Sequence, residues 1–248
     1  MEANSLFHTV LLSLGFQVFI AGARVYNSAA ERYGGFSHCN NIVIIGGERW
    51  MVDVGFGANG PTIPLPLRHD EPQTHIQGTP SLVRLMYESI PQNVDQGQKL
   101  WIYQHRLNHD PTSKWTPMYC FVDFEFLLED INGMNLSPWK SPHSWFTQKV
   151  VLTRFTTDSE ILHRDVDTPQ ITSEGTMTEG SIDGTLILFQ DTVKWRRGGE
   201  TKLQIKLESE EDRIGALWKY FDIELEDEDR EAIRGTVSEI KCEFRPFG

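Results

Sequence analysis

Cysteine is scarce in this sequence of 248 residues, which contains Cys39, Cys120 and Cys242 and no CxxC pair. The sequence also lacks an HExxH motif and any closely spaced pair of histidines near a cysteine, so we predict no metal site. An odd, small number of cysteines is typical of a reducing compartment and argues against a disulfide scaffold. A chain of this length buries roughly 70% of its unfolded surface, so it needs neither disulfides nor metal to fold.

Positive charge is lacking as well. Lys and Arg number 23 against 35 Asp and Glu, which gives a formal net charge of −12. Binding to nucleic acid or to an anionic membrane surface requires a field of cations that faces phosphates, so we expect neither as a partner. We interpret the acidic runs 208–212 and 224–231 as solvated helix faces.

No hydrophobic run is long enough to be a convincing membrane span. Residues 6–23 carry no formal charge, but His8, Ser13 and Gln17 interrupt the apolar stretch. Glu2 stands where a signal peptide would carry a cation. We therefore predict a cytoplasmic protein.

The first residues predict a helix followed by a strand. Asn4 is a candidate N-cap, Gly15 ends the helix, and residues 16–21 are β-prone. The expected apolar side of the helix consists of Leu6, Val10, Leu11 and Leu14.

Short β-prone runs and turns follow up to about residue 121. Gly46 and Gly47 predict a tight hairpin turn between strands 41–45 and 49–53. This spacing of short strands predicts an antiparallel barrel or sandwich. Further strands are expected at 82–88 and 100–106.

The second half of the sequence mixes helices and strands. Residues 123–132 predict a helix with Asp123 as N-cap, followed by a Pro-rich loop at 137–142, and Ser209 is a candidate N-cap for a late helix. The absence of a βαβ alternation predicts an α+β fold and no parallel nucleotide-binding sheet. The apolar side of the 123–132 helix would be Phe124, Leu127, Leu128 and Ile131. Strands are expected at 147–155, 185–189, 192–196 and 201–207.

His38 and Asp53 are the first candidates for chemistry. A hairpin that turns at Gly46 and Gly47 brings them close together, because His38 precedes one strand and Asp53 ends the next. An aspartate beside a histidine fixes the tautomer of the ring and stabilises the imidazolium, as in a nucleophile–base–acid triad. The alternative is a hydrogen bond with only a structural role.

The segments beside this pair offer weaker candidates. Residues 54–60 form a glycine-rich turn whose glycines permit positive φ and a close approach of ligand to backbone; the alternative is a plain loop. Cys39 is adjacent to His38, but successive strand residues point to opposite faces, so we interpret it as buried and inert.

Several motifs, in order and with matching spacing, resemble the arylamine N-acetyltransferase family, particularly its fungal members. In that family Arg-Gly-Gly-x-Cys-x-Glu-x-Asn is followed by Leu-Gly-Phe, a Thr/Ser-His strand and Val-Asp-x-Gly-Phe-Gly. The resemblance covers nearly all of the chain. The matching segments are Met1-Glu2-Ala3-Asn4, Leu14-Gly15-Phe16, Ser37-His38, Val52-Asp53-Val54-Gly55-Phe56-Gly57 and Ser141-Pro142-His143-Ser144-Trp145-Phe146-Thr147.

The resemblance implies an α+β fold in three parts. Residues 1–15 would be the end of a helical domain whose remainder is missing. Residues 16–122 would form an antiparallel β-barrel, and residues 123–248 an α/β lid.

The resemblance also implies an activity: transfer of an acyl group, usually acetyl, from coenzyme A to an arylamine, hydrazine or N-hydroxyarylamine through a cysteine thioester. Acyl-CoA is then a co-substrate, and no permanently bound cofactor is implied. The implied roles are catalytic for His38 and Asp53, acceptor binding for Val25, Phe56 and Phe146, and coenzyme A binding for Gly57.

The sequence departs from the family pattern at the nucleophile. Glu2 matches the Glu of Cys-x-Glu, so the cysteine would stand directly before Met1. The chain as written is therefore expected to be inactive. We interpret Met1 as an internal residue of a longer, active acyltransferase; the alternative is a truncated, non-catalytic binding protein that keeps the pocket.

Two further questions stay open from the sequence. A His–Asp hydrolase that uses water or a serine, either Ser37 or another, is a weaker alternative, because no Gly-x-Ser-x-Gly motif is present. Fungal relatives differ between acetyl and malonyl donors, and a malonyl carboxylate requires a cation in the pocket. The candidate cations are Arg24, Arg68, Arg196 and Arg197, of which most are expected to be surface residues.

Overall fold

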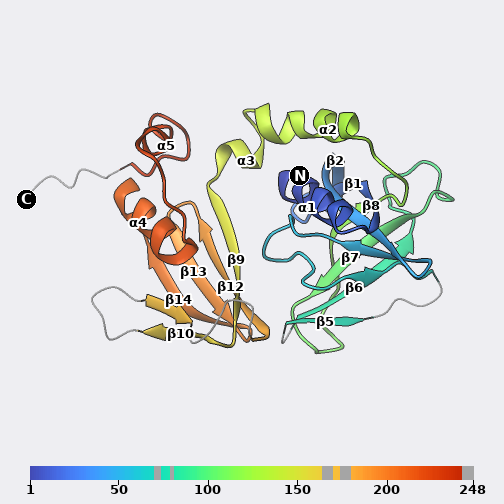
Figure 1. Cartoon of the computed structure of the whole chain (residues 1–248), viewed down its shortest axis with the longest axis horizontal. Coiled ribbons are helices and arrows are strands. Elements are labelled where there is room, and N and C mark those ends of the chain that lie inside the picture. The colour runs from blue at the N-terminus through green and yellow to red at the C-terminus, as the bar shows by residue number, and fades with distance from the viewer. Residues whose placement is uncertain (70–73, 79–80, 164–169, 174–179, 242–248) are drawn as a thin grey trace, which may run out of the picture. The chain divides into compact units, whose positions relative to one another are not determined.

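The computed structural model describes residues 1–69, 74–78, 81–163, 170–173 and 180–241 (Figure 1). The chain divides into two compact units, residues 1–144 and 145–248. The three-part division that the family resemblance implies stays a prediction. None of the helices in the described ranges is long and apolar enough to cross a membrane.

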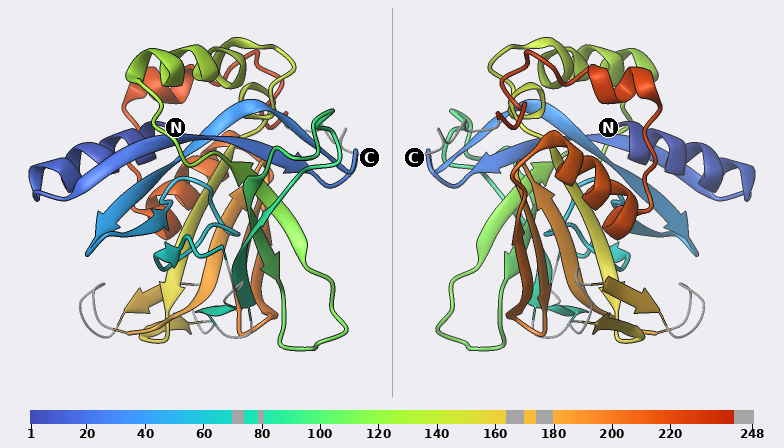
Figure 2. Two further views of the ribbon diagram at one scale, coloured as in Figure 1. Left: turned by 90° about the vertical axis from the view of Figure 1, so that its right-hand side faces the viewer. Right: turned by 90° about the vertical axis from the view of Figure 1, so that its left-hand side faces the viewer.

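The first unit is built on an eight-stranded antiparallel sheet in the order β4-β3-β2-β1-β8-β7-β6-β5. The sheet curls until residues of β4 contact β6, so it is a nearly closed barrel (Figure 2). The strands are β1 (Gln17–Asn27), β2 (Arg32–Ile45), β3 (Glu48–Val52), β4 (Leu65–Pro66), β5 (His75–Gly78), β6 (Ser81–Glu88), β7 (Leu100–Arg106) and β8 (Thr116–Phe121). Helices α1 (Glu2–Ser13) and α2 (Leu128–Lys140) pack on this sheet.

Alternating side chains of these strands fill the barrel. Trp101 and Tyr103 of β7 point inward at every second position, as period-2 strands require. The inner core consists of Ala21, Ala23, Ile42, Met51, Leu65, Val83, Leu85, Trp101, Tyr103, Tyr119 and Phe121.

The β2–β3 hairpin has the register that its turn predicts. Gly46 and Gly47 adopt φ of 59° and 83°, which a two-residue hairpin turn requires and most other residues avoid. Asn41 therefore pairs with Val52, and Ile45 pairs with Glu48. This register decides which residues of the two strands meet at the far end of the hairpin.

Helix α1 differs from its prediction in two ways. Asn4 lies inside the helix and is fully buried, whereas Met1 occupies the N-cap position. The predicted apolar side is largely exposed, and of its four members only Leu11 is buried. The sheet is contacted instead by the stripe Asn4, Phe7 and Leu11, because residues three and four apart share a helix face. The exposed members are Leu6, Val10 and Leu14.

Helix α2 begins later than predicted and ends later. Asp130 accepts the backbone N–H of Leu127 at 2.9 Å, so the helix begins at Leu128, and Asp123 is not its N-cap. The helix continues through Pro138 to Lys140, where a loop was predicted, although this proline has no backbone N–H to donate. Of the predicted apolar side only Ile131 is buried, whereas Phe124, Leu127 and Leu128 are exposed.

The second unit contains a four-stranded antiparallel sheet in the order β14-β13-β12-β9 and a two-stranded sheet, β10-β11. Ser209 caps α4 as predicted, since its Oγ accepts the Asp212 N–H at 3.1 Å. The elements are α3 (Trp145–Gln148), β9 (Val151–Thr157), β10 (Glu160–His163), β11 (Gln170–Ser173), β12 (Ile182–Phe189), β13 (Thr192–Arg197), β14 (Glu200–Lys206), α4 (Glu210–Phe221) and α5 (Asp227–Glu231). Their core is Leu186, Leu188, Val193, Trp195, Leu203, Leu207, Ala216, Leu217 and Tyr220.

A buried arginine joins three segments of this unit. Arg213 of α4 is 3% exposed and donates from Nε to Glu210 Oε2 at 2.9 Å. Its Nη1 donates to the Gln190 carbonyl at 3.2 Å, and its Nη2 donates to the Ser238 carbonyl at 2.9 Å. Glu210 in turn accepts the Ile240 N–H at 2.6 Å.

Replacing this arginine is expected to destabilise the second unit strongly. Arg213→Ala leaves the Glu210 carboxylate without its cation, which costs about 3–5 kcal/mol in comparable buried pairs. Arg234→Ala is the matched control, because Arg234 and Glu231 form an exposed pair with the same spacing, and it should cost less than about 1 kcal/mol. Urea unfolding followed by circular dichroism measures both. Equal losses in the two variants would contradict the prediction.

Candidate active site

The predicted proximity of His38 and Asp53 is confirmed. His38 lies in β2, and Asp53 follows directly after β3 on the neighbouring strand. The His38 Nε2 and Asp53 Oδ2 atoms are 2.7 Å apart, and the two residues are 6% and 5% exposed. Across the other edge of β2, His38 pairs with the fully buried Ala23 of β1.

The second carboxylate oxygen of Asp53 accepts two more hydrogen bonds. Asn4 Nδ2 and the Gly55 backbone N–H each donate to Asp53 Oδ1 at 2.8 Å. Burial alone would raise the pKa of Asp53, but the charge of His38 and the hydrogen bonds from His38, Asn4 and Gly55 outweigh it and lower the pKa below the usual value. The carboxylate therefore stays ionised at neutral pH.

This arrangement favours one placement of the proton on the His38 ring. An ionised Asp53 at Nε2 favours the neutral tautomer that carries its proton on Nε2. The other ring nitrogen, Nδ1, is then the proton acceptor, and a thiol placed beside it can be held as a thiolate.

Aromatic rings surround the His38 imidazole. The ring centroids of Phe56 and Tyr119 lie 5.3 and 5.2 Å from that of His38, and 4.8 Å from each other. Burial raises the pKa of Tyr119 well above its ordinary value, and the negative charge of Asp53 adds to the effect. The pair therefore sits in an apolar, poorly hydrated environment, where charge interactions are stronger than in water.

The glycine-rich turn after Asp53 is held against the barrel. Gly57 adopts φ of 87°, and its carbonyl accepts the Gly60 N–H at 2.8 Å. Tyr103 donates its hydroxyl to the Asn59 carbonyl at 2.9 Å. Gly57 thus occupies a backbone conformation that a side chain would strain.

Residues 1–178 match the sequence profile of a family described as N-acetyltransferase, which is most of the chain. The chain is also 32% identical over 249 residues to N-malonyltransferase FDB2 of Fusarium pseudograminearum (strain CS3096), across 94% of this chain and 67% of that protein. The chain belongs to the arylamine N-acetyltransferase family. The predicted membership is therefore confirmed.

Solved structures of the family have the same fold. The arylamine N-acetyltransferase of Mycobacterium abscessus superposes with a TM-score of 0.69 at 21% identity, over 91% of this chain and 67% of that one. The Mycobacterium marinum enzyme in complex with CoA gives 0.63 at 21% identity, over 92% and 72%. This likeness confirms the predicted α+β fold with an antiparallel barrel. The chain spans about two thirds of the length of the Fusarium relative.

The remaining residues that the family resemblance singled out lie in different parts of the structure. Val25 of β1 pairs with Tyr119 of β8, whose ring touches His38. Phe146 belongs to the second unit, where it is 68% exposed on α3 with its ring 5.3 Å from that of Trp145. The roles of both in binding an acceptor stay predictions.

The cysteines of the described ranges are not candidates for the family's nucleophile. Cys39 packs between Ile20 and Ile131, and burial raises its pKa to about 11. Cys120 is fully buried as well, and burial raises its pKa to about 12. Neither is a thiolate at neutral pH. Cys242 lies outside the described residues.

The arginines considered for a malonyl carboxylate have other contacts. Arg24 stacks 4.0 Å from the centroid of Phe36 and donates to the Gly34 carbonyl at 3.3 Å. Arg68 pairs with Glu48 at 3.3 Å near the turn of the β2–β3 hairpin. In the second unit, Arg197 pairs with Asp183 at 2.5 Å, and Arg196 is exposed on β13. Among the described residues, no group of three or more His, Cys, Asp or Glu is arranged to hold a metal ion.

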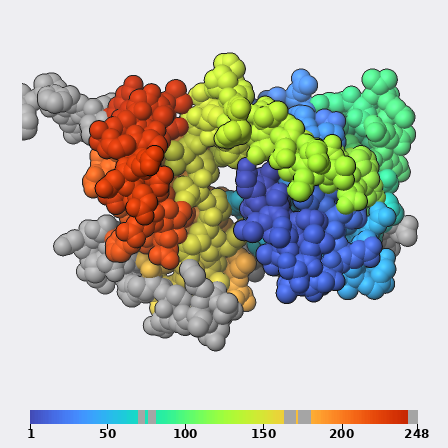
Figure 3. All heavy atoms as spheres, turned by 45° about the horizontal axis from the view of Figure 1, so that its top comes forward, coloured from blue at the N-terminus to red at the C-terminus, as the bar shows by residue number. Residues whose placement is uncertain are grey.

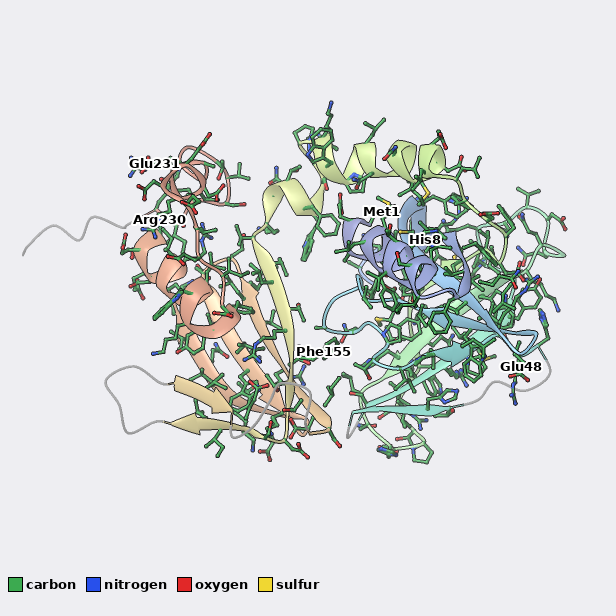
Figure 4. The ribbon with its side chains drawn as sticks, viewed as in Figure 1. Met1, His8, Glu48, Phe155, Arg230 and Glu231 are labelled. Carbon is green, nitrogen blue, oxygen red and sulfur yellow. The ribbon has the colours of Figure 1, made fainter. Side chains whose placement is uncertain are left out.

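Two residues of the first helical turn were missed as parts of the site. Asn4 was predicted as a helix cap, yet it binds Asp53. Glu2 Oε1 accepts a hydrogen bond from Asn135 Nδ2 of α2 at 2.7 Å, and a backbone hydrogen bond together with that of Asn135 lowers its pKa to about 2. The start of α1 is therefore bonded to β2, to the segment that follows β3 and to α2 (Figures 3 and 4). The only sequence signal was that both residues stand in the family's Glu-x-Asn motif.

Proposed function

We propose that this protein is an acyl-CoA-dependent N-acyltransferase that acts on an arylamine, N-hydroxyarylamine or hydrazine through a cysteine thioester. The observation that carries the proposal is the buried His38–Asp53 pair, which Asn4 joins to the first turn of α1. Membership of the family and the CoA complex of the Mycobacterium marinum relative support it.

The proposed nucleophile is a cysteine thiol at the position directly before Met1. The Met1 carbonyl lies 3.9 Å from Cys39 Sγ, and Cys39 follows His38 in β2, so a residue joined to the Met1 nitrogen begins beside this strand. That position precedes the N-terminus of α1, where the helix dipole favours a thiolate. His38 Nδ1 takes the thiol proton, and Asp53 stabilises the resulting imidazolium.

The proposed reaction has two steps. First, the thiolate attacks the acyl carbonyl of acyl-CoA: a C–S bond to the enzyme forms, the bond to the CoA sulfur breaks, and the leaving CoA thiolate takes the proton held by His38. Then the amine nitrogen attacks the thioester: a C–N bond forms, the enzyme C–S bond breaks, and His38 takes the amine proton. The second step restores the thiolate and the imidazolium.

The substrate contacts belong to the same proposal. Phe56, packed against the His38 ring, would contact the aryl ring of the acceptor, and Val25 would pack beside it. The acceptor-binding role that the family resemblance implies for Phe146 stays a prediction. The backbone at Gly57 has no side chain and would approach coenzyme A closely.

The acyl donor distinguishes the two activities that the relatives suggest. The Fusarium relative is an N-malonyltransferase, whereas the family is described as N-acetyltransferase. The test uses a chain extended before Met1 by a segment that ends in Arg-Gly-Gly-x-Cys, incubated separately with malonyl-CoA and with acetyl-CoA. Intact mass then reports one acyl group on the added cysteine, formed with release of CoA, and loss of that acyl group upon addition of an arylamine, with formation of the amide, reports transfer. Formation of neither adduct by a folded protein would contradict the proposal.

A further inference from the structure

The Asn4 side chain makes three hydrogen bonds to the segments that carry His38 and Asp53. The residue is fully buried, and its Nδ2 donates to Asp53 Oδ1 at 2.8 Å and to the Cys39 carbonyl at 2.6 Å. Its Oδ1 accepts the Val54 N–H at 3.0 Å. A flipped amide would set oxygen against two oxygens and nitrogen against an N–H, so these partners fix its orientation.

The position of Asn4 on α1 connects these hydrogen bonds with the proposed position of the nucleophile. It lies four residues after the position directly before Met1, which is about one helical turn. That position lies just outside α1, before the N-cap Met1, and Asn4 links the first turn of the helix to the aspartate that orients His38.

We propose that Asn4 is a positioning residue that fixes the Asp53 carboxylate relative to His38 and to the start of α1. This inference rests on the proposed function only for its effect on acyl transfer. The effect on Asp53 and His38 follows from the hydrogen bonds alone.

Gly55 supports the assignment independently. A Cβ atom built on Gly55 would lie 2.9 Å from Asn4 Nδ2, closer than side chains tolerate. The Gly55 N–H also donates to the same Asp53 oxygen as Asn4. The glycine of the Val-Asp-x-Gly segment therefore leaves the space that the Asn4 amide occupies, and Gly55→Ala should displace this amide without deleting it.

Asn41 offers a matched control, because it also joins α1 to the sheet. It is fully buried, and its Nδ2 donates to the Asn4 backbone carbonyl at 3.0 Å. This bond holds the helix backbone and does not reach Asp53. A purely structural role for Asn4 predicts the same consequences for Asn4→Ala and Asn41→Ala, whereas a positioning role predicts a difference.

The experiment is nuclear magnetic resonance of the chain as it stands, following the Asp53 carboxyl carbon and the His38 ring nitrogens against pH. Asn4→Ala is expected to raise the Asp53 titration midpoint by roughly one pH unit and to reduce the share of the Nε2-protonated neutral His38 tautomer. Asn41→Ala should lower the thermal midpoint but leave both signals unchanged. Gly55→Ala should shift them as Asn4→Ala does, and it provides the test should Asn4→Ala fail to fold.

Unchanged Asp53 and His38 signals in folded Asn4→Ala or Gly55→Ala would overturn the proposal, as would equal shifts in Asn41→Ala. In the extended, cysteine-bearing chain, Asn4→Ala should lower kcat by roughly 10²-fold with KM little changed. Absence of acyl transfer by the extended chain itself would contradict the proposed function. The magnetic resonance result would still decide the role of Asn4.

Discussion

The chain of 248 residues is expected to transfer no acyl group from malonyl-CoA or acetyl-CoA, whereas the same chain extended before Met1 through Arg-Gly-Gly-x-Cys is expected to transfer it. The reason is that, in the proposed mechanism, His38 and Asp53 activate a thiol but do not replace one. The cysteines of the described ranges cannot substitute, because burial raises the pKa of Cys39 to about 11 and that of Cys120 to about 12. The measurement is amide formation from a model arylamine with each donor.

Two matched variants of the extended chain test whether the added cysteine is the nucleophile. Serine in place of the added cysteine should abolish transfer, since a serine hydroxyl is a much weaker nucleophile beside the same base. Cys39→Ala should leave transfer intact, because the Cys39 thiol packs against Ile20 and Ile131. Transfer by the unextended chain would point to another nucleophile such as Ser37. A folded but inactive extended chain would favour a non-catalytic binding protein.

Asp53→Asn is expected to lower acyl transfer by the extended chain roughly 10³–10⁴-fold, the scale seen when the orienting aspartate of a catalytic triad becomes an amide. Two donors, Asn4 Nδ2 and the Gly55 N–H, converge on one oxygen of Asp53. The single oxygen of an asparagine is therefore expected to stay with them, which turns its NH₂ group towards His38 Nε2. His38 would then carry its proton on Nδ1 and could not accept one from a thiol.

The measurement is kcat/KM together with the His38 tautomer from ring-nitrogen shifts. Asp123→Asn is the control, because Asp123 accepts from Trp101 Nε1 and pairs with Arg49 without contact to His38. It should leave both quantities unchanged. Activity of Asp53→Asn within tenfold of the parent, or an unchanged tautomer, would contradict the mechanism.

The site was partly readable from the sequence because its first members are linked by a short turn. Gly46 and Gly47 specify a two-residue hairpin, and the register of that hairpin brings His38 and Asp53 together. The same strand alternation predicted that Cys39 is buried, as observed. These signals extend over about fifteen residues and need no knowledge of distant segments.

The helices show where local reasoning fails. The apolar residues Leu6, Val10 and Leu14 suggested one buried side of α1, but the sheet contacts the side that carries a polar residue, Asn4. A periodicity argument uses only the apolar residues of a helix. It therefore misses Asn4, whose side chain is buried because it bonds to Asp53, 49 residues away. The start of α2 was misplaced for a similar reason, because Asp130 rather than Asp123 completes its first turn.

The sequence by itself determined the family, the α+β class, the antiparallel barrel and the His38–Asp53 pair, since motif order, turn glycines and strand alternation are local properties. Only the tertiary structure decided that Asn4, Gly55 and His38 share one carboxylate, and that Glu2 reaches Asn135 of α2. Such contacts depend on how the helices pack on the sheet. The free energy of that packing is a sum over many side chains far apart in the sequence, so no local pattern specifies it.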